Sequence, residues 1–462
     1  MRSSHSSTAV FAAFDDANLL AYGGLAPAVR LAERCGLPGL VREKVHLADA
    51  GNGAGAAPDA KTMSLVAAML SGADSIDDTD VLRHGALARA FTGMRAPSTL
   101  GSFLRAFTWG HVRQLESAAR AFTRNLAGHC NLLPGADQVV YLDIDSKVKQ
   151  VYGAGKQGAE HGYTKVRGLH FQIVTASTPL AAPVIVASRL RKGSAGSAKG
   201  AAHLIAEAIR AVRAMGATGL IVARADSAFF SHKVVAACRR AGARFSLALA
   251  QRKKVRGAIA AIPEDAWTPI KYPKAIWDAA EQRWVSDAEV AEVEYTAFTG
   301  KAKKYRTTAR LLVRRVKRLN DAHVPSGQGE LFAAWRFHAV FTDSPFPLVE
   351  AERCHRAHAI IEQVFADLED SALAHLPSGK FTANAAWLTL ATLAHNLTRA
   401  LGTLASAFHA KARPGTIRRQ LVAVPTRLAT QARTLTFHLS ARWPWQDAFE
   451  ALWTATGCRL RT

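Results

Sequence analysis

Cysteine and long apolar runs are both scarce in this chain of 462 residues. The five cysteines are scattered, and no two of them are separated by only two residues. The sequence therefore supports neither a disulfide framework nor a zinc ribbon. No stretch approaches the roughly 18 consecutive apolar residues of a membrane-spanning helix, and the N-terminus lacks the apolar centre and cleavage site of a signal peptide. We expect a cytoplasmic protein whose thiols stay reduced.

Acidic residues are also few. The chain has 36 Asp and Glu against 59 Lys and Arg, which gives a formal net charge of +23 at pH 7. A balance this basic indicates a polyanionic partner, either a nucleic acid or an anionic membrane surface. Apolar residues make up 49% of the chain, which is typical of a folded protein and excludes a disordered one. The working class is a folded protein that handles DNA or RNA.

The first 135 residues are expected to form a helical N-terminal domain. Apolar residues recur at three- and four-residue spacing in residues 28–45 and again in residues 100–126. A helix-cap signal at Ser98 precedes basic side chains that would suit a helix-turn-helix DNA reader, although an ordinary helical bundle with a basic surface fits the same pattern. These basic side chains are Arg105, His111 and Arg113.

Residues 136–250 change to a strand-rich pattern. Apolar and polar residues alternate in residues 137–148, as they do in a half-buried strand. Further strands and helices follow at short intervals, which predicts a mixed α/β sheet. The strands are expected at 169–177, 182–190, 217–226 and 243–250, and the helices at 198–216 and 231–242.

Three further regions complete the predicted organisation. Residues 251–345 hold basic runs between strand-like segments, and we expect a β-rich insertion there. Residues 346–415 are expected to form two long helices, over 348–376 and 381–411. Residues 416–462 are expected to form C-terminal strands and a tail.

Two predicted strands carry carboxylates at their ends. Asp145 follows Asp143 on the same face of one strand, and Asp226 ends another. Carboxylate oxygens are common ligands of divalent cations. A lone strand-end aspartate more often caps the next segment, but here both strands belong to one predicted sheet in a strongly basic chain. The pattern favours Mg²⁺-assisted phosphoryl transfer, in which two metal ions clamp the attacking and leaving oxygens.

Glu362 is the third candidate carboxylate. It lies beside the apolar stripe of the helix expected over residues 348–376, where an unpaired carboxylate is costly unless it binds a metal ion. An arginine partner, or a side chain that reaches into water, would explain the position equally well. His355, His358 and Glu362 also resemble a zinc pattern, but an HExxH motif and a second ligand cluster are both missing, so zinc is not favoured.

Three segments resemble the signatures of bacterial insertion-sequence transposases of the Asp-Asp-Glu (DDE) type, in particular the group catalogued as thirteen-eighty. They are YLDIDSKVKQVYG (141–153), ARADSAFF (223–230) and the segment of residues 352–388. Within the last segment, HLPSGKFTANAAWL is the most specific motif. The resemblance extends over roughly residues 10 to 450, in order.

The resemblance implies an RNase H-like mixed-sheet catalytic core, interrupted by the β-rich insertion and preceded by the helical N-terminal domain. Asp226 matches the second acid of the triad, and Glu362 matches the helical glutamate. Asp145, which is followed by Ser146, is the preferred first acid, with Asp143 as its substitute. The resemblance implies that Asp145, Asp226 and Glu362 bind two Mg²⁺ ions, with Mn²⁺ as the alternative metal.

The chain departs from the wider family pattern around Glu362. Related transposases place a Tyr and an Arg seven and four residues before this glutamate and a Lys seven residues after it, where this chain has His355, His358 and Glu369. The two histidines stay candidate DNA contacts, together with basic residues near the predicted core strands. These basic residues are Lys147, Lys149, Lys165, Arg167, Arg191 and Lys192.

The predicted function is Mg²⁺-dependent cleavage at the ends of an insertion sequence, followed by strand transfer into target DNA. Two alternatives remain: an RNase H-like nuclease without strand transfer, and a non-catalytic DNA-binding protein. The predicted partners are the terminal inverted repeats, the target DNA and a second copy of the chain on DNA, because synapsis joins two ends. We expect no membrane partner and a location at the bacterial nucleoid.

Overall fold

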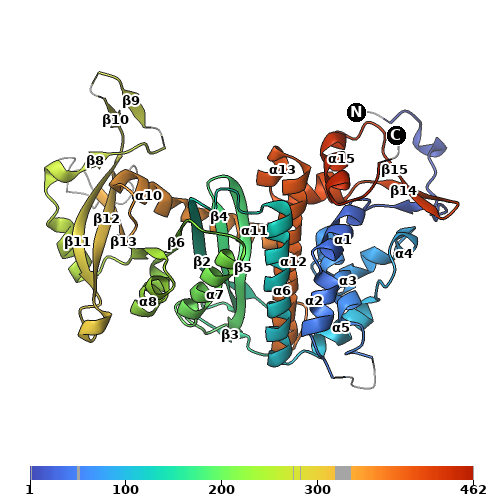
Figure 1. The fold of residues 1–462 in the computed structure, drawn as a ribbon, viewed down its shortest axis with the longest axis horizontal. Coiled ribbons are helices and arrows are strands. Elements are labelled where there is room, and N and C mark those ends of the chain that lie inside the picture. The colour runs from blue at the N-terminus through green and yellow to red at the C-terminus, as the bar shows by residue number, and fades with distance from the viewer. Residues whose placement is uncertain (2, 49–52, 274, 281, 318–334, 461–462) are drawn as a thin grey trace.

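The computed structural model describes residues 1, 3–48, 53–273, 275–280, 282–317 and 335–460. Its parts lie in a row (Figure 1). The helices of the N-terminal region lie beside the C-terminal segment at one end, a mixed sheet with its helices occupies the middle, and the strands that follow residue 267 lie at the other end. Within the described residues, no helix has both the length and the apolar character needed to cross a membrane.

The middle of the protein is a mixed sheet. Strand β2 is its central strand, with β4 antiparallel on one side and β6 parallel on the other; β5 continues the antiparallel side and β7 the parallel side. The predicted mixed α/β class is therefore confirmed, and this sheet is consistent with an RNase H-like core. The bounds are β2 Val139–Gln150, β3 Glu160–His161, β4 Arg167–Thr178, β5 Ala181–Lys192, β6 Leu220–Ala225 and β7 Arg244–Leu249.

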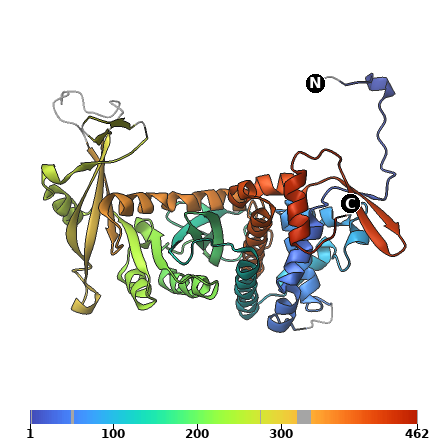
Figure 2. The same cartoon turned by 45° about the horizontal axis from the view of Figure 1, so that its top comes forward.

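Helices cover both faces of this sheet, which is why its inner strands are apolar on both sides. Helix α7 (Ala201–Ala214), with α8 (His232–Arg240), covers one face, and α11 (Ile360–Glu369), which carries Glu362, lies on the other (Figure 2). Because β2 and β6 are parallel, the chain must cross over between them, and α7 makes this connection.

The strands between residues 268 and 342 extend the central sheet. Strand β13 pairs antiparallel with β7, and β12, β11 and β8 follow in order outward, while β9 and β10 form a separate hairpin. The region is rich in strands, as expected, but it continues the core sheet without a break; residues 318–334 of the predicted insertion lie outside the described residues. The bounds are α9 Lys253–Ala260, β8 Thr268–Pro269, β9 Ile276–Asp278, β10 Arg283–Val285, β11 Ala288–Ala297, β12 Thr307–Lys317 and β13 Trp335–Thr342.

The two long helices expected after residue 346 are both interrupted. The first is divided into α10 (Leu348–Arg356) and α11 (Ile360–Glu369) by a single 3₁₀ turn, and it ends seven residues earlier than expected. The second is α12 (Phe381–Ala405), which is separated from α13 (Ala407–Lys411) at Ser406. Ser406 has an extended backbone, and its side chain accepts a hydrogen bond from the backbone of His409, so it caps α13 as a new helix.

Helix α12 is the buried axis of the helical end. Nearly all of its residues are buried, between α6 and β5 on one side and the N-terminal helices on the other. The two ends of the chain also meet, because β1 pairs with β14 of the C-terminal hairpin. The bounds are β1 Leu19–Leu20, α1 Leu25–Arg34, α2 Leu37–Lys44, α3 Pro58–Ser71, α4 Leu87–Ala90, α5 Pro97–Arg105, α6 Trp109–Cys130, α14 Pro414–Ile417, β14 Thr426–Gln431, β15 Thr434–Leu439 and α15 Gln446–Ala455.

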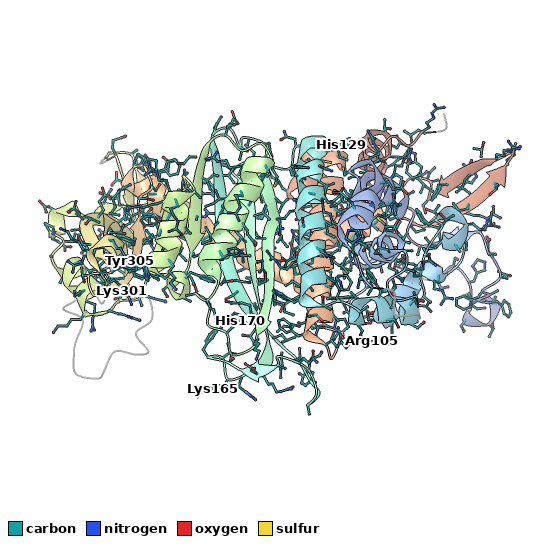
Figure 3. All side chains as sticks on the ribbon, turned by 60° about the horizontal axis from the view of Figure 1, so that its bottom comes forward. Arg105, His129, Lys165, His170, Lys301 and Tyr305 are labelled. Atoms are coloured by element: carbon teal, nitrogen blue, oxygen red, sulfur yellow. The ribbon has the colours of Figure 1, made fainter. Side chains whose placement is uncertain are left out.

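The continuous run expected over residues 100–126 is broken between α5 and α6. The Thr108 hydroxyl accepts a hydrogen bond from the backbone of His111, and the His111 ring accepts one from the backbone of Thr108, so the two residues form a capping box. Arg113 pairs with Glu116 and Glu207 inside the protein. His111 and Arg113 therefore serve the fold, which leaves Arg105 as the exposed member of the three expected DNA contacts (Figure 3).

Asn396 forms hydrogen bonds with the backbone of β5 at a β-bulge. The register between β4 and β5 shifts at this point, and the Asn396 side chain pairs with both the N–H and the C=O of Ile185, at 2.8 and 2.7 Å. Both hydrogen bonds are buried, so the loss of Asn396 would remove a partner from each of these backbone groups.

Replacing Asn396 by alanine should lower the free energy of unfolding by about 2–4 kcal/mol, because two buried backbone groups lose their hydrogen bonds. Urea unfolding followed by circular dichroism measures the change. Thr398→Ala is the matched control on the same helix. In the described part of the chain its buried hydroxyl bonds only the carbonyl of Ala394 in its own helix, so less than about 1 kcal/mol is expected. Equal losses of unfolding free energy in the two variants would contradict the role of Asn396 as the hydrogen-bond partner of the Ile185 backbone.

Candidate active site

Three of the predicted acidic residues come together beside β2. Asp145 lies in β2, Asp226 directly follows β6, and Glu362 lies in the first turn of α11. In the parallel register, Ile144 lies next to Ala225, so the two aspartates occupy the next positions on neighbouring strands. Burial, together with the negative charges of Asp226 and Glu362, raises the pKa of Asp145 to about 6. Asp145 is thus close enough to both other carboxylates to be repelled by them.

The two aspartates are held by backbone N–H groups. The Asp145 carboxylate accepts a hydrogen bond from Ser146 at 2.6 Å, and the Asp226 carboxylate accepts one from Ala228 at 3.0 Å, which caps a short 3₁₀ turn. Burial raises the pKa of Asp226 as well. Within the described residues, neither aspartate forms an ion pair with a lysine or arginine, and the same is true of the exposed Glu362. Their remaining oxygen lone pairs are available to a cation.

The carboxylates of this site are suitable metal ligands, but they do not form a complete coordination shell. Among the residues that the structure describes, no three His, Cys, Asp or Glu side chains are arranged to hold a metal ion, and this includes the zinc pattern of His355, His358 and Glu362. Carboxylates are nevertheless the hard oxygen donors that Mg²⁺ prefers, and a bound cation would relieve the repulsion that Asp226 and Glu362 exert on Asp145. The donor set therefore fits a divalent cation.

Asp143 has a different role from the one expected. Its side chain is fully buried, and its two oxygens accept hydrogen bonds from Arg224, each at 2.7 Å. A third bond, of 2.8 Å, comes from Nδ1 of His358. Although burial raises it, the pKa of Asp143 is lowered overall by Arg224 and His358. These contacts occupy both oxygens of Asp143, so Asp145 stays the preferred first acid and Asp143 the less suitable substitute.

Arg224 is the important residue that sequence reasoning missed. Its guanidinium is 2% exposed, lies 4.3 Å from the centre of the Tyr141 ring, and donates to the carbonyl of Cys354 as well as to Asp143. It therefore joins β6 to β2 and α10. The available signal was an arginine inside the otherwise apolar strand of residues 220–225, since a charge at such a position needs a buried partner.

The two histidines of α10 and the following turn differ in their surroundings. His358 is held by Asp143 and lies close enough to Asp145 and Asp226 that its positive form lowers the pKa of both carboxyls. His355 forms a hydrogen bond of 2.9 Å with Ser246, and burial lowers its pKa to about 3. His355 is therefore neutral at pH 7 and offers a phosphate no positive charge, which removes it from the expected DNA contacts.

The basic residues predicted to bind DNA fall into three groups. Lys147 and Lys149 lie on the same face of β2 as Asp145 and form ion pairs of 2.7 and 3.7 Å with Glu369. Glu369, which ends α11, therefore offsets part of the positive charge that these two lysines place on β2.

Lys165 and Lys192 are exposed near the ends of β3, β4 and β5, and Lys165 lies at the tip of this part of the sheet (Figure 3). Arg167, by contrast, donates to the carbonyls of Gly153 and Ala154. Arg191 is buried and donates to three carbonyls of the loop that follows β5, so it supports that loop and is not accessible to DNA; the carbonyls belong to Gly196, Ser197 and Lys199.

The model of the family described as "Transposase DDE domain group 1" matches residues 2–456, nearly the whole chain. The chain belongs to the DDE transposase family. Transposases of this family act on DNA and generally use divalent metals. The narrower resemblance to the thirteen-eighty group stays a prediction, and no curated protein matches the chain.

Asp145 should make the stability of the metal-free transposase depend on pH. Its pKa is about 6 in the folded chain and near 3.8 when unfolded, so stability falls as the pH rises through this window. Asp145→Asn removes the titrating group. Relative to the wild type, this variant should gain about 2 kcal/mol between pH 4 and pH 7.

Urea unfolding in EDTA at pH 4, 5, 6 and 7 tests this expectation. The control is Asp265→Asn, which changes an exposed aspartate away from the site. A constant difference between Asp145→Asn and the wild type over the whole range would show that Asp145 does not titrate as described.

Proposed function

We propose that the protein is a transposase that cleaves DNA at the ends of an insertion sequence and joins those ends to target DNA, with Asp145, Asp226 and Glu362 as its catalytic triad. The observation that carries the proposal is the effect of Asp226 and Glu362 on the pKa of Asp145, which brings carboxylates from β2, β6 and α11 near one another, with no ion pair to a lysine or arginine among the described residues. Membership of the DDE family supports the same assignment.

The triad residues would bind two Mg²⁺ ions, which lower the pKa of the attacking water and stabilise the leaving 3′ oxygen. The chain itself positions these ligands. Asp145 and Asp226 hold neighbouring places on parallel strands, and backbone N–H groups orient their carboxylates. Glu362 approaches from the helix above the sheet. In this arrangement the protein contributes mainly orientation and electrostatic preorganisation.

We include His358 among the residues that contact the DNA backbone. Its Nδ1 donates to Asp143, and Arg224 donates a hydrogen bond to each oxygen of the same carboxylate. The ring orientation is thereby fixed, and Nε2 stays available for a phosphate oxygen near Asp145 and Asp226. Lys147 and Lys149 would add positive charge along the same face of β2. Two copies of the chain would act together, because two element ends must be joined.

A strand-transfer assay distinguishes this function from the alternatives. We expect the wild-type protein with Mg²⁺ to convert a labelled duplex carrying the terminal repeat, taken from the DNA that flanks the gene, into a product joined to a target plasmid. Nicked ends without joined product would indicate a nuclease of the same core. Binding without cleavage, in Mg²⁺ and also in Mn²⁺, would indicate a DNA-binding protein and contradict the proposal.

Asp226→Asn and Glu362→Gln should each reduce cleavage at least about 100-fold, because even the outer-shell partners of a metal ligand cost 10–100-fold when they are removed. DNA binding measured in EDTA should remain, since phosphate contacts supply most of the affinity. The matched control is Glu294→Gln, which neutralises an exposed glutamate on β11 and should cleave like the wild type. Normal cleavage by either triad variant would contradict the site assignment.

A further inference from the structure

A cavity of about 560 Å³ lies between α6 and α7, with part of α2 at its side. None of Asp145, Asp226 and Glu362 lines it, so it is separate from the proposed catalytic site. Three of its lining residues are arginines: Arg120 and Arg124 from α6, and Arg210 from α7. Basic side chains from two neighbouring helices therefore form part of the cavity wall.

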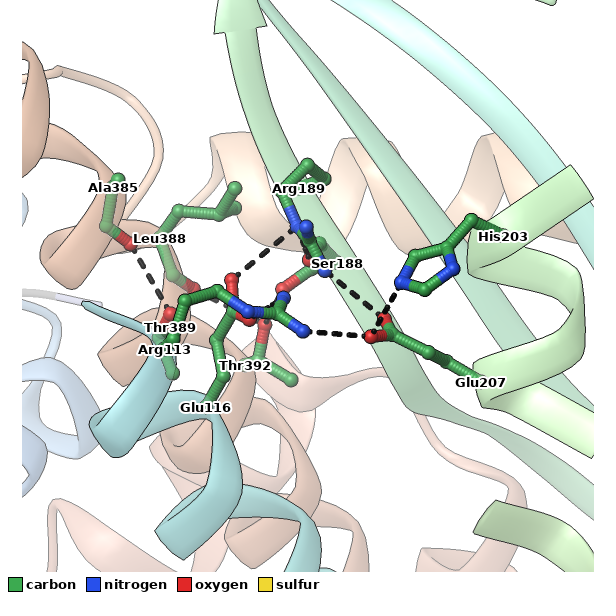
Figure 4. Close-up of polar contacts among 10 residues, drawn as sticks. All are labelled: Arg113, Glu116, Ser188, Arg189, His203, Glu207, Ala385, Leu388, Thr389 and Thr392. Atoms are coloured by element: carbon green, nitrogen blue, oxygen red, sulfur yellow. Dashed lines mark hydrogen bonds and ion pairs between the residues drawn. The ribbon is translucent and has the colours of Figure 1, made fainter. Parts of the chain in front are cut away.

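The glutamates near this cavity are already neutralised. Glu207, which lines the cavity, accepts hydrogen bonds from Arg113 at 2.8 Å and from Arg189 at 3.0 Å (Figure 4). The same two arginines also pair with Glu116. Two arginines thus balance two glutamates, and His203 adds a further contact to Glu207. At the side of the cavity, Glu43 is paired with Lys44.

The three lining arginines have no such balance. Within the described residues, Arg120, Arg124 and Arg210 form no ion pair and donate no hydrogen bond. Arg120 is partly buried, and this burial lowers its pKa, with Glu207 and Glu116 only partly opposing the change. Arg124 and Arg210 are exposed at the opening of the cavity. Desolvating a guanidinium without a partner is costly, and an anion in the cavity would remove that cost.

We propose that the cavity between α6 and α7 binds phosphate groups of a DNA duplex outside the cleavage site, through Arg120, Arg124 and Arg210. A guanidinium presents a planar fork of donors that matches the oxygens of a phosphate. The choice of DNA as the source of the phosphate rests on the proposed function, while the uncompensated charge does not. The cavity would hold a segment of the substrate while the carboxylates act on another.

The salt dependence of DNA binding tests this site without any need for cleavage. Binding of a labelled 30-base-pair duplex is measured by fluorescence anisotropy in EDTA, between 50 and 300 mM KCl. Arg120→Gln/Arg210→Gln should weaken binding and make the slope of log affinity against log salt less steep by about 1.8, since each phosphate contact contributes about 0.9. Arg124→Gln, an exposed change that spares the fold, should reduce the slope by about 0.9.

The matched control is Lys233→Gln/Arg240→Gln, which removes the same charge from exposed positions on the neighbouring helix α8. We expect its slope to stay close to that of the wild type. If this control changes the slope as much as the cavity variants do, or if Arg124→Gln leaves the slope unchanged, the proposed site is wrong.

A thermal-shift titration with inorganic phosphate separates the two sources of the anion. Weak or absent stabilisation of the wild type by phosphate, together with the reduced DNA slope of the cavity variants, supports DNA as the ligand. Strong stabilisation of the wild type but not of the variants, with an unchanged DNA slope, would overturn it. If the wild type fails to cleave DNA, but its salt slope still differs from that of the cavity variants, the proposed function is rejected and this binding site is retained.

Discussion

The pair formed by Asp143 and Arg224 is the interaction on which the candidate active site depends. Both side chains are buried, and two hydrogen bonds of 2.7 Å join them across neighbouring strands. A buried ion pair is weak evidence for stability, because desolvation offsets much of its attraction. Here the pair fixes geometry: it locks β2 beside β6, and it holds His358 and the backbone of Cys354 against the sheet. Two residues further along each strand, these constraints set where Asp145 and Asp226 lie.

The distribution of charge separates the functions of the molecule. Carboxylates are few, and most of those in the interior are neutralised by arginines, as Glu116 and Glu207 are in the cluster between α6, β5 and α7. The half-buried Asp145 and the exposed Asp226 have no such partner among the described residues. The lining arginines of the cavity between α6 and α7 are the opposite case, because they are cations without an acidic partner. Unbalanced charge of each sign therefore gathers at a different place, one suited to cations and the other to phosphates.

The sequence predicted where several strands lie along the chain, but it did not predict which side chains and strands pair with one another. The strands β2, β6 and β7 followed from alternating or continuous apolar residues, and Asp145, Asp226 and Glu362 from the family motifs. Alternation placed Asp143 on the face of Asp145, but it did not reveal the arginine that occupies both of its oxygens. The extension of the sheet by β13 was hidden as well, since strand pairing depends on residues far apart in the chain.

Interruptions in helices were missed for a related reason. The apolar stripe continues through the turn between α10 and α11, so periodicity predicted one helix. The break before α6 depends on a single side chain, Thr108, whose capping bond competes with helix continuation. Arg191 was assigned to DNA because it stands in a basic run, whereas its donors are used by the adjacent loop. Composition records that charge is present, but only packing decides whether that charge is accessible.

The contact between β1 and β14 has a consequence for biosynthesis. Residues 19–20 find their strand partners only at residues 426–427, and the N-terminal helices pack on α12, which begins at residue 381. More than three quarters of the polypeptide must be translated before the first helices can contact these neighbours. A nascent or prematurely terminated chain would leave apolar helix surfaces open to chaperones and proteases. Folding of the N-terminal helices is thus coupled to synthesis of α12 and β14.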